Sequence, residues 1–168
     1  KDLYEVKSLI DIGCTEDIPE TTNTLEGNAK QKADYVKEKY GYDCFADDTG
    51  LEVEALDGAP GVFTARYGGP EKDAQQNMNY LMNELEKVGA LAPSERGARF
   101  RTAIHLIING KEVGLEGICK GHIAPLQSGT AGFGYDPVYI PKGEDRTFSE
   151  MSAEEKNSMS HRGSAIRL

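Results

Sequence analysis

The sequence predicts an α/β fold in which two lobes share a mixed sheet. Amphipathic helices alternate with strands in the first half, and a long hairpin occupies much of the second half. The length of 168 residues suits one domain, or two closely packed lobes, with a substantial core. We therefore expect residues 1–168 to form a single two-lobed domain.

The first predicted helix lies between Thr24 and Gly41. Asn23 and Glu26 resemble a capping box, which places the helix start near Thr24, and Gly41 is expected to end it. The apolar residues in between recur every three or four positions, which is the stripe of an amphipathic helix. They are Leu25, Ala29, Ala33, Val36 and Tyr40.

The next segment, "CFADDTGLEVEAL", is predicted to form two strands joined by a turn. The first strand is expected over Cys44–Asp47, the turn over Asp48–Gly50, and an alternating strand begins at Leu51. Two adjacent carboxylates would then lie at a strand-to-turn junction. Because neighbouring carboxylates repel, a cation, a proton or backbone N–H groups must compensate there.

The remaining elements follow from turn and capping signals. The Gly- and Pro-rich stretch 56–70 predicts an ordered loop, and 74–88 predicts a second helix. A hairpin is expected to turn at Asn109-Gly110. The glycine-rich "PLQSGTAGFGYDP" then enters a short strand over Val138–Ile140. A Ser-x-x-Glu capping box predicts a last helix from about Ala153.

Composition narrows the classes of function. The net charge of −9 argues against a nucleic-acid polymer as partner, since such binding needs many contacts from Lys and Arg to phosphates. No apolar run approaches the roughly 20 residues that span a bilayer, so we expect a soluble, cytoplasmic protein without membrane contact. Three cysteines without C-x-x-C spacing predict reduced thiols.

Two stretches carry residues suited to chemistry. Asp47 and Asp48 suit a divalent cation, and one of them could deprotonate an attacking water, although an Asx-type turn explains the same residues. The stretch "SGTAGFGYDP" could bring backbone N–H groups to a phosphate, with Phe133 or Tyr135 offering an aromatic face. A tight turn before an edge strand explains it equally well.

The basic residues near the chain end form a second candidate group. Lys156, His161 and Arg162 gather in an otherwise acidic protein, where favourable placement at a helix C-terminus is the simpler explanation. Lys32 flanks the apolar stripe of the first helix and either points to a site or is solvated. Two histidines in and after the hairpin are expected to be structural: His105 and His122.

Taken together, five strings spread from Asn23 to Gly163 resemble the inosine triphosphate pyrophosphatase family. In order they are "NTLEGNAKQKA", "ADDTGLEVEALDGAPGVFTARYGG", "GFGYDP", "FSEMSAEEKN" and "SHRG". The resemblance implies Mg²⁺-dependent hydrolysis of non-standard purine nucleoside triphosphates (ITP, dITP and XTP) to the monophosphate and pyrophosphate, which cleanses the nucleotide pool. It also implies a homodimer whose two-lobed subunits bind the nucleotide in a cleft between lobes.

The resemblance also implies roles for individual residues. Asp48 would be the general base and a metal ligand, Asp47 would support the cation, and Thr49 would contact the substrate. The base pocket and the nucleotide contacts are the remaining assignments: Phe133, Gly134, Tyr135 and Asp136 for the pocket, with Lys156, His161, Arg162 and Lys32 for the nucleotide.

The chain departs from the family pattern at two places. The family's metal-binding Glu corresponds to Gly27, and Glu26 lies about 100° away around a helix, so it replaces that ligand only if the helix start is remodelled. The family's first strand and S/T-x-N-x-x-K phosphate loop are expected to be missing, because the chain begins at "KDLYEVKSLI". Two alternatives stay open: a pyrophosphatase with another nucleotide preference, and a nucleotide-binding protein without catalysis.

Overall fold

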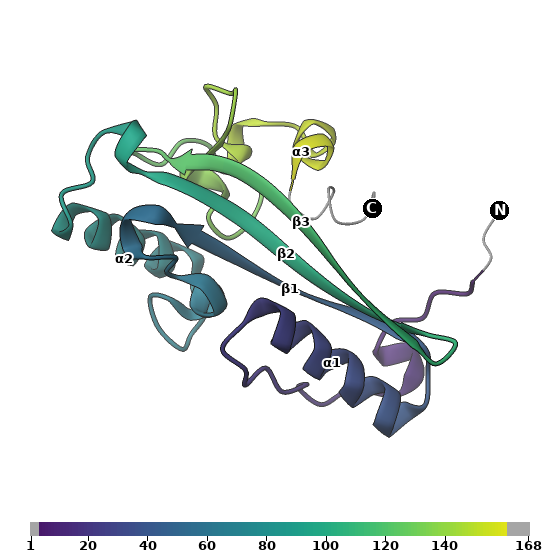
Figure 1. Cartoon of the computed structure of the whole chain (residues 1–168). Helices are drawn as coiled ribbons and strands as arrows, with labels where there is room; N and C mark the ends of the chain where they lie inside the picture. The colour runs from purple at the N-terminus through teal and green to yellow at the C-terminus, as the bar shows by residue number, and fades with distance from the viewer. Residues whose placement is uncertain (1–3, 161–168) are drawn as a thin grey trace.

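A four-stranded sheet with flanking helices forms the centre of the computed structural model, which describes residues 4–160 (Figure 1). The strands lie in chain order across the sheet: β1 (Cys44–Val53), β2 (Gly97–Ile108), β3 (Lys111–Ile123) and β4 (Tyr139–Pro141). All three pairings within this part of the chain are antiparallel. The α/β class is confirmed, but the described sheet is antiparallel rather than mixed.

Three helices flank the strands: α1 (Leu25–Tyr40), α2 (Ala74–Lys87) and α3 (Ala153–Met159). In Figure 1, α1 follows one half of the long strands, α2 lies near the other half, and α3 lies across the sheet from α1. Thr24 caps α1, because its hydroxyl accepts a 2.9 Å bond from the Gly27 N–H. The predicted capping residue Asn23 is therefore wrong by one position, while the end at Gly41 is confirmed.

Strand β1 is continuous, which corrects the predicted turn at Asp48–Gly50. Ten residues pair with β2 without interruption, and the Thr49 hydroxyl bonds to the Thr102 hydroxyl across the ladder at 2.8 Å. Gly50 has a packing role instead, because a Cβ there would lie 2.7 Å from the Gly61 carbonyl oxygen. The glycine lets the 3₁₀ turn Gly61–Arg66 approach the strand closely.

The hairpin between β2 and β3 turns at Asn109-Gly110, as predicted from the sequence. Asn109 and Gly110 have φ angles of 51° and 75°, the positive values that a type I′ turn needs at both central positions. The short strand β4 begins one residue later than predicted, and α3 begins at Ala153 with its predicted capping box. In residues 4–160, no helix is long and apolar enough to cross a membrane.

The apolar core is divided along β1 into a large and a small cluster. The large one joins α2 to one end of the sheet and to the segment around Tyr139 and Phe148. The small one holds α1 to the sheet through Leu25, Ala29 and Ala103. Asp48 and Thr49 therefore lie on the strand that connects the two packed regions.

Candidate active site

A cavity of about 290 Å³ lies beside β1 and the glycine-rich loop. Six residues predicted from the sequence to bind substrate line it together: Thr49, Phe133, Gly134, Tyr135, Asp136 and Lys156. A larger groove, of about 750 Å³, lies elsewhere on the sheet between Arg99, Lys120 and acidic residues. It contains none of the residues predicted to bind substrate and no Phe, Tyr or Trp, so the smaller cavity is the better candidate for a nucleotide base.

Asp136 organises one wall of this cavity. Its carboxylate is 4% exposed and accepts bonds from the Phe133 N–H at 3.0 Å and from Lys156 Nζ at 2.5 Å. Lys156 Nζ also lies 4.0 Å from the centre of the Phe133 ring, which is a cation–π contact. The Phe133 side chain itself is 71% exposed. The wall thus offers an aromatic face and an ammonium group held by a buried carboxylate.

The hydroxyl group of Tyr135 is engaged in a hydrogen bond within the protein. It donates a 2.7 Å bond to the Thr64 carbonyl oxygen. Burial raises the pKa of Tyr135 well above its usual value, so the phenol stays neutral. The Thr64 hydroxyl in turn accepts from the Leu51 N–H at 2.9 Å, which connects this wall to β1. We therefore assign Tyr135 to shaping the cavity.

Asp48 lies on the other face of β1 from the cavity. Adjacent strand residues point to opposite faces, so Thr49 faces the cavity while Asp48 faces α1. The amide Nδ2 of Asn28, on α1, donates to Asp48 Oδ2 at 3.1 Å. Asn28 is 2% exposed, and its Oδ1 accepts from the Thr22 N–H and hydroxyl, each at 2.9 Å. These bonds orient the amide group toward the carboxylate.

The surroundings of Asp48 make its carboxylate unusually basic. Burial raises the pKa of Asp48, while the Asn28 bond and the Lys32 ammonium counteract part of the rise and Glu20 adds to it. Lys32 Nζ is also 3.2 Å from Glu20 Oε1. A partly buried carboxylate with raised pKa, a second carboxylate and an ammonium group therefore gather at the start of α1. A carboxylate with a raised pKa beside a specific charged group is often found at functional sites.

Glu26 does not join this group. Its carboxylate forms an ion pair with Arg101, whose side chain also contacts Glu52 and Glu116 at 3.2 and 3.3 Å. A side chain at position 27 would collide with Thr22, so the helix start is packed around glycine. The remodelling that Glu26 would need to replace the family ligand is not seen.

Asp47 and Asp48 are also separated. Asp47 shares a face of β1 with Thr49, so the two neighbouring carboxylates do not converge from one side of the strand. The predicted joint role of both residues at one cation is therefore not supported by the strand geometry. His161 and Arg162, predicted to hold the nucleotide, lie outside the described residues.

Sequence reasoning missed several residues at these two places. Asn28 lies beside Ala29 on the sheet-facing side of α1. A polar residue next to the apolar stripe of the helix was the one sequence feature that could have indicated its role. Lys72, Thr64 and Asn77 line the cavity through contacts between distant segments, so no local pattern indicated them.

The fold and the site define an α/β protein with a pocket beside β1 and, on the other face of that strand, a carboxylate whose pKa is raised. Sequence comparison gives the family directly, because the profile of the Ham1 family matches residues 1–168. The chain belongs to the Ham1 family. The resemblance to the inosine triphosphate pyrophosphatases read from the five strings is thereby confirmed.

Relatives and solved structures agree with this placement. The dITP/XTP pyrophosphatase of Flavobacterium johnsoniae is 53% identical over 96% of this chain and 82% of its own length. That of Bacillus subtilis is 44% identical over 98% and 82%. The Ham1 protein of Staphylococcus aureus superposes with a TM-score of 0.84 at 35% identity, covering 92% of this chain and 78% of that one.

Proposed function

We propose that this Ham1-family protein is a dITP/XTP pyrophosphatase, which hydrolyses non-standard purine nucleoside triphosphates to the monophosphate and pyrophosphate. The observation that carries the proposal is the cavity lined by Phe133, Asp136 and Lys156, with the carboxylate of Asp48, whose pKa is raised, on the other face of the same strand. Relatives that share about half of the sequence carry the same name. The function predicted from sequence is the same.

The nucleotide would bridge the two faces of β1. The base stacks on the exposed Phe133 ring, and the phosphates pass the outer side of β1 toward Asp48 and the start of α1. This arrangement would place the nucleotide between the two packed regions of the core.

Asp48 would act as the general base. Products of monophosphate and pyrophosphate require water to attack the α-phosphorus while the bond to the bridging oxygen breaks. Asp48 accepts the proton that the water loses, and its raised pKa makes it a better acceptor than an ordinary aspartate. Asn28 holds the carboxylate in place, and Lys32 adds positive charge next to the phosphates.

The residues near Asp48 fit a magnesium ion. Mg²⁺ is usually held by one or two carboxylates together with substrate phosphates, and Asp48 and Glu20 supply such a pair. When bound, the ion would neutralise charge on the phosphates and on the leaving pyrophosphate. Glu20 replaces Glu26 in this proposal, because Glu20 lies close enough to Asp48 to raise its pKa, whereas Glu26 is directed to Arg101; Glu20 would exchange its contact with Lys32 for the ion.

Selectivity would come from the donors that line the cavity. Lys72 and Lys156 carry ammonium groups, which donate hydrogen bonds and cannot accept them. The hypoxanthine base of ITP and the xanthine base of XTP present a 6-keto acceptor, whereas the adenine base of ATP presents an amino donor. A mispaired buried polar group costs about 1–3 kcal/mol, so ITP should exceed ATP by roughly 5- to 150-fold in kcat/KM.

A panel of nucleotides tests the proposal. Pyrophosphate release with Mg²⁺ should be fastest with ITP, dITP and XTP, and slow with ATP and dUTP. Equal rates with ITP and ATP would instead support a pyrophosphatase of other preference, and ITP binding without turnover would support a non-catalytic protein. We also propose a cytoplasmic homodimer, whose subunit number light scattering after size-exclusion chromatography would measure.

A further inference from the structure

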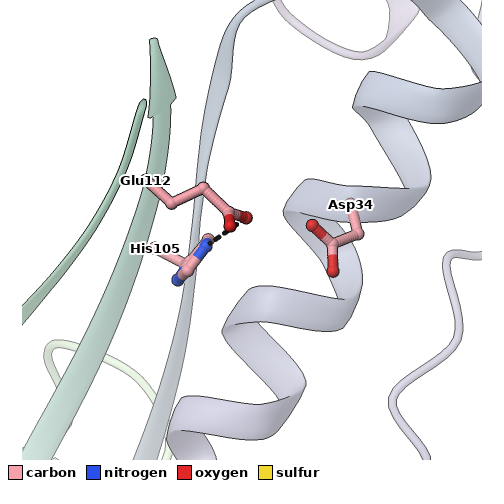
Figure 2. A group of neighbouring side chains, drawn as sticks. All are labelled: Asp34, His105 and Glu112. Atoms are coloured by element: carbon pink, nitrogen blue, oxygen red, sulfur yellow. Dashed lines mark hydrogen bonds and ion pairs between the residues drawn. The ribbon is translucent and has the colours of Figure 1, made fainter. Parts of the chain in front are cut away.

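Three potential metal ligands from three elements meet on the sheet face that α1 covers. Asp34 comes from α1, His105 from β2 and Glu112 from β3 (Figure 2). One ligand atom from each lies within 4.8 Å of the others, and His105 Nε2 is 3.1 Å from Glu112 Oε1. Ligand atoms around a tetrahedral zinc ion lie roughly 3.4 Å apart. The His105 and Glu112 atoms are therefore already at a suitable separation.

Small neighbours leave room around the imidazole. In the ladder, His105 lies between Ala46 of β1 and Gly114 of β3. A Cβ added at Gly114 would meet nothing within 4 Å, so the flank on that side is open. The His105 side chain is 15% exposed and the Glu112 side chain 47% exposed, so ions can reach the group from solvent.

A cation already bridges the two carboxylates. Lys30 Nζ lies 2.7 Å from Asp34 Oδ2 and 3.4 Å from Glu112 Oε1. The two carboxylates are thus near enough to share one positive charge.

We propose that Asp34, His105 and Glu112 form a binding site for a divalent transition-metal ion such as Zn²⁺, in which the metal displaces the Lys30 ammonium group. One imidazole and two carboxylates suit zinc, whereas Mg²⁺ favours oxygen ligands alone. Because the ligands come from α1 and from both strands of the hairpin, the ion would fasten α1 to the sheet. This site is separate from the one proposed for the nucleotide, and it does not depend on that function.

Zinc titration of the metal-free protein tests the site. Isothermal titration with ZnCl₂ at pH 7.5 should show one site, and the melting temperature should rise with ZnCl₂ but not with equal MgCl₂. His105→Gln and Glu112→Gln should each weaken zinc binding at least tenfold. Lys30→Gln should strengthen it, because the competing cation is removed. Acidification should weaken binding, since protons compete for the imidazole nitrogen.

His122→Gln is the matched control, because His122 lies on β3 outside the group. This variant should bind zinc like the wild type, and circular dichroism without metal should show that all four variants fold. The proposal is overturned if the wild type binds no zinc at millimolar concentration, or if His105→Gln binds as tightly as the wild type. Weakening by His122→Gln equal to that by His105→Gln, or no gain with Lys30→Gln, would also overturn it.

Discussion

Removing Lys156 should destabilise the protein far more than removing the charge of its partner. Lys156→Met leaves the buried Asp136 carboxylate with the hydrogen bond from the Phe133 N–H but without its counter-ion. Breaking a buried ion pair in this way costs about 3–5 kcal/mol. Because the Lys156 side chain is 15% exposed, water can partly replace it, and we expect about 3 kcal/mol.

Asp136→Asn should cost less, about 1 kcal/mol, because the amide oxygen can still accept from Phe133 and Lys156 can turn toward solvent. In Lys156→Met/Asp136→Asn no unpaired charge remains. The double variant should therefore be more stable than Lys156→Met alone. Urea unfolding followed by circular dichroism measures the free energy of each protein. Additivity of the two single effects to within about 0.5 kcal/mol would refute the ion pair as the organiser of this wall.

Three further outcomes follow from the site. Phe133→Ala should raise KM for ITP about tenfold or more, since stacking of a base on an aromatic ring contributes about 1–3 kcal/mol. Phe133→Tyr keeps an aromatic ring and should therefore keep most of the affinity. Asn28→Ala should move the acidic limb of the pH–rate profile to higher pH, because a bond that favours the ionised form of Asp48 is lost; an unmoved limb would contradict that contact. Asp48→Asn should stabilise the fold at pH 8 but not near pH 3.5. Burial raises the pKa of Asp48, so ionisation of this carboxylate opposes folding as pH rises through that pKa. Melting curves of the variant and the wild type at the two pH values measure the difference.

Local patterns were sufficient for most of the elements and for one wall of the site. The stripe of α1, the Asn109-Gly110 turn and the capping box of α3 depend on neighbours in the chain, and the structure confirms each. The glycine-rich loop and Lys156 were found through motifs and do line one cavity. Residues whose role is local, or whose motif is distinctive, were therefore predictable.

The features that the sequence did not predict depend on contacts between distant segments. Asp48–Gly50 has the composition of a turn, but pairing with β2 keeps it extended, and Gly50 is explained by the approach of Gly61. Strand direction depends on the path of the whole chain, so the antiparallel sheet was not predicted. The metal assignment of Glu26 stays a prediction, but its ion pair with Arg101, which lies far along the sequence, could not be foreseen.

The turnover of Asp48→Asn with ITP and Mg²⁺ tests the central claim most directly. An amide cannot accept the proton of the attacking water, and general-base catalysis typically contributes about 10²–10⁴-fold. We expect pyrophosphate release to fall by about that factor or more, while ITP binding measured by calorimetry without Mg²⁺ is retained, because Asp48 faces away from the base cavity. A kcat within about threefold of the wild type would contradict the assignment of Asp48 as the base.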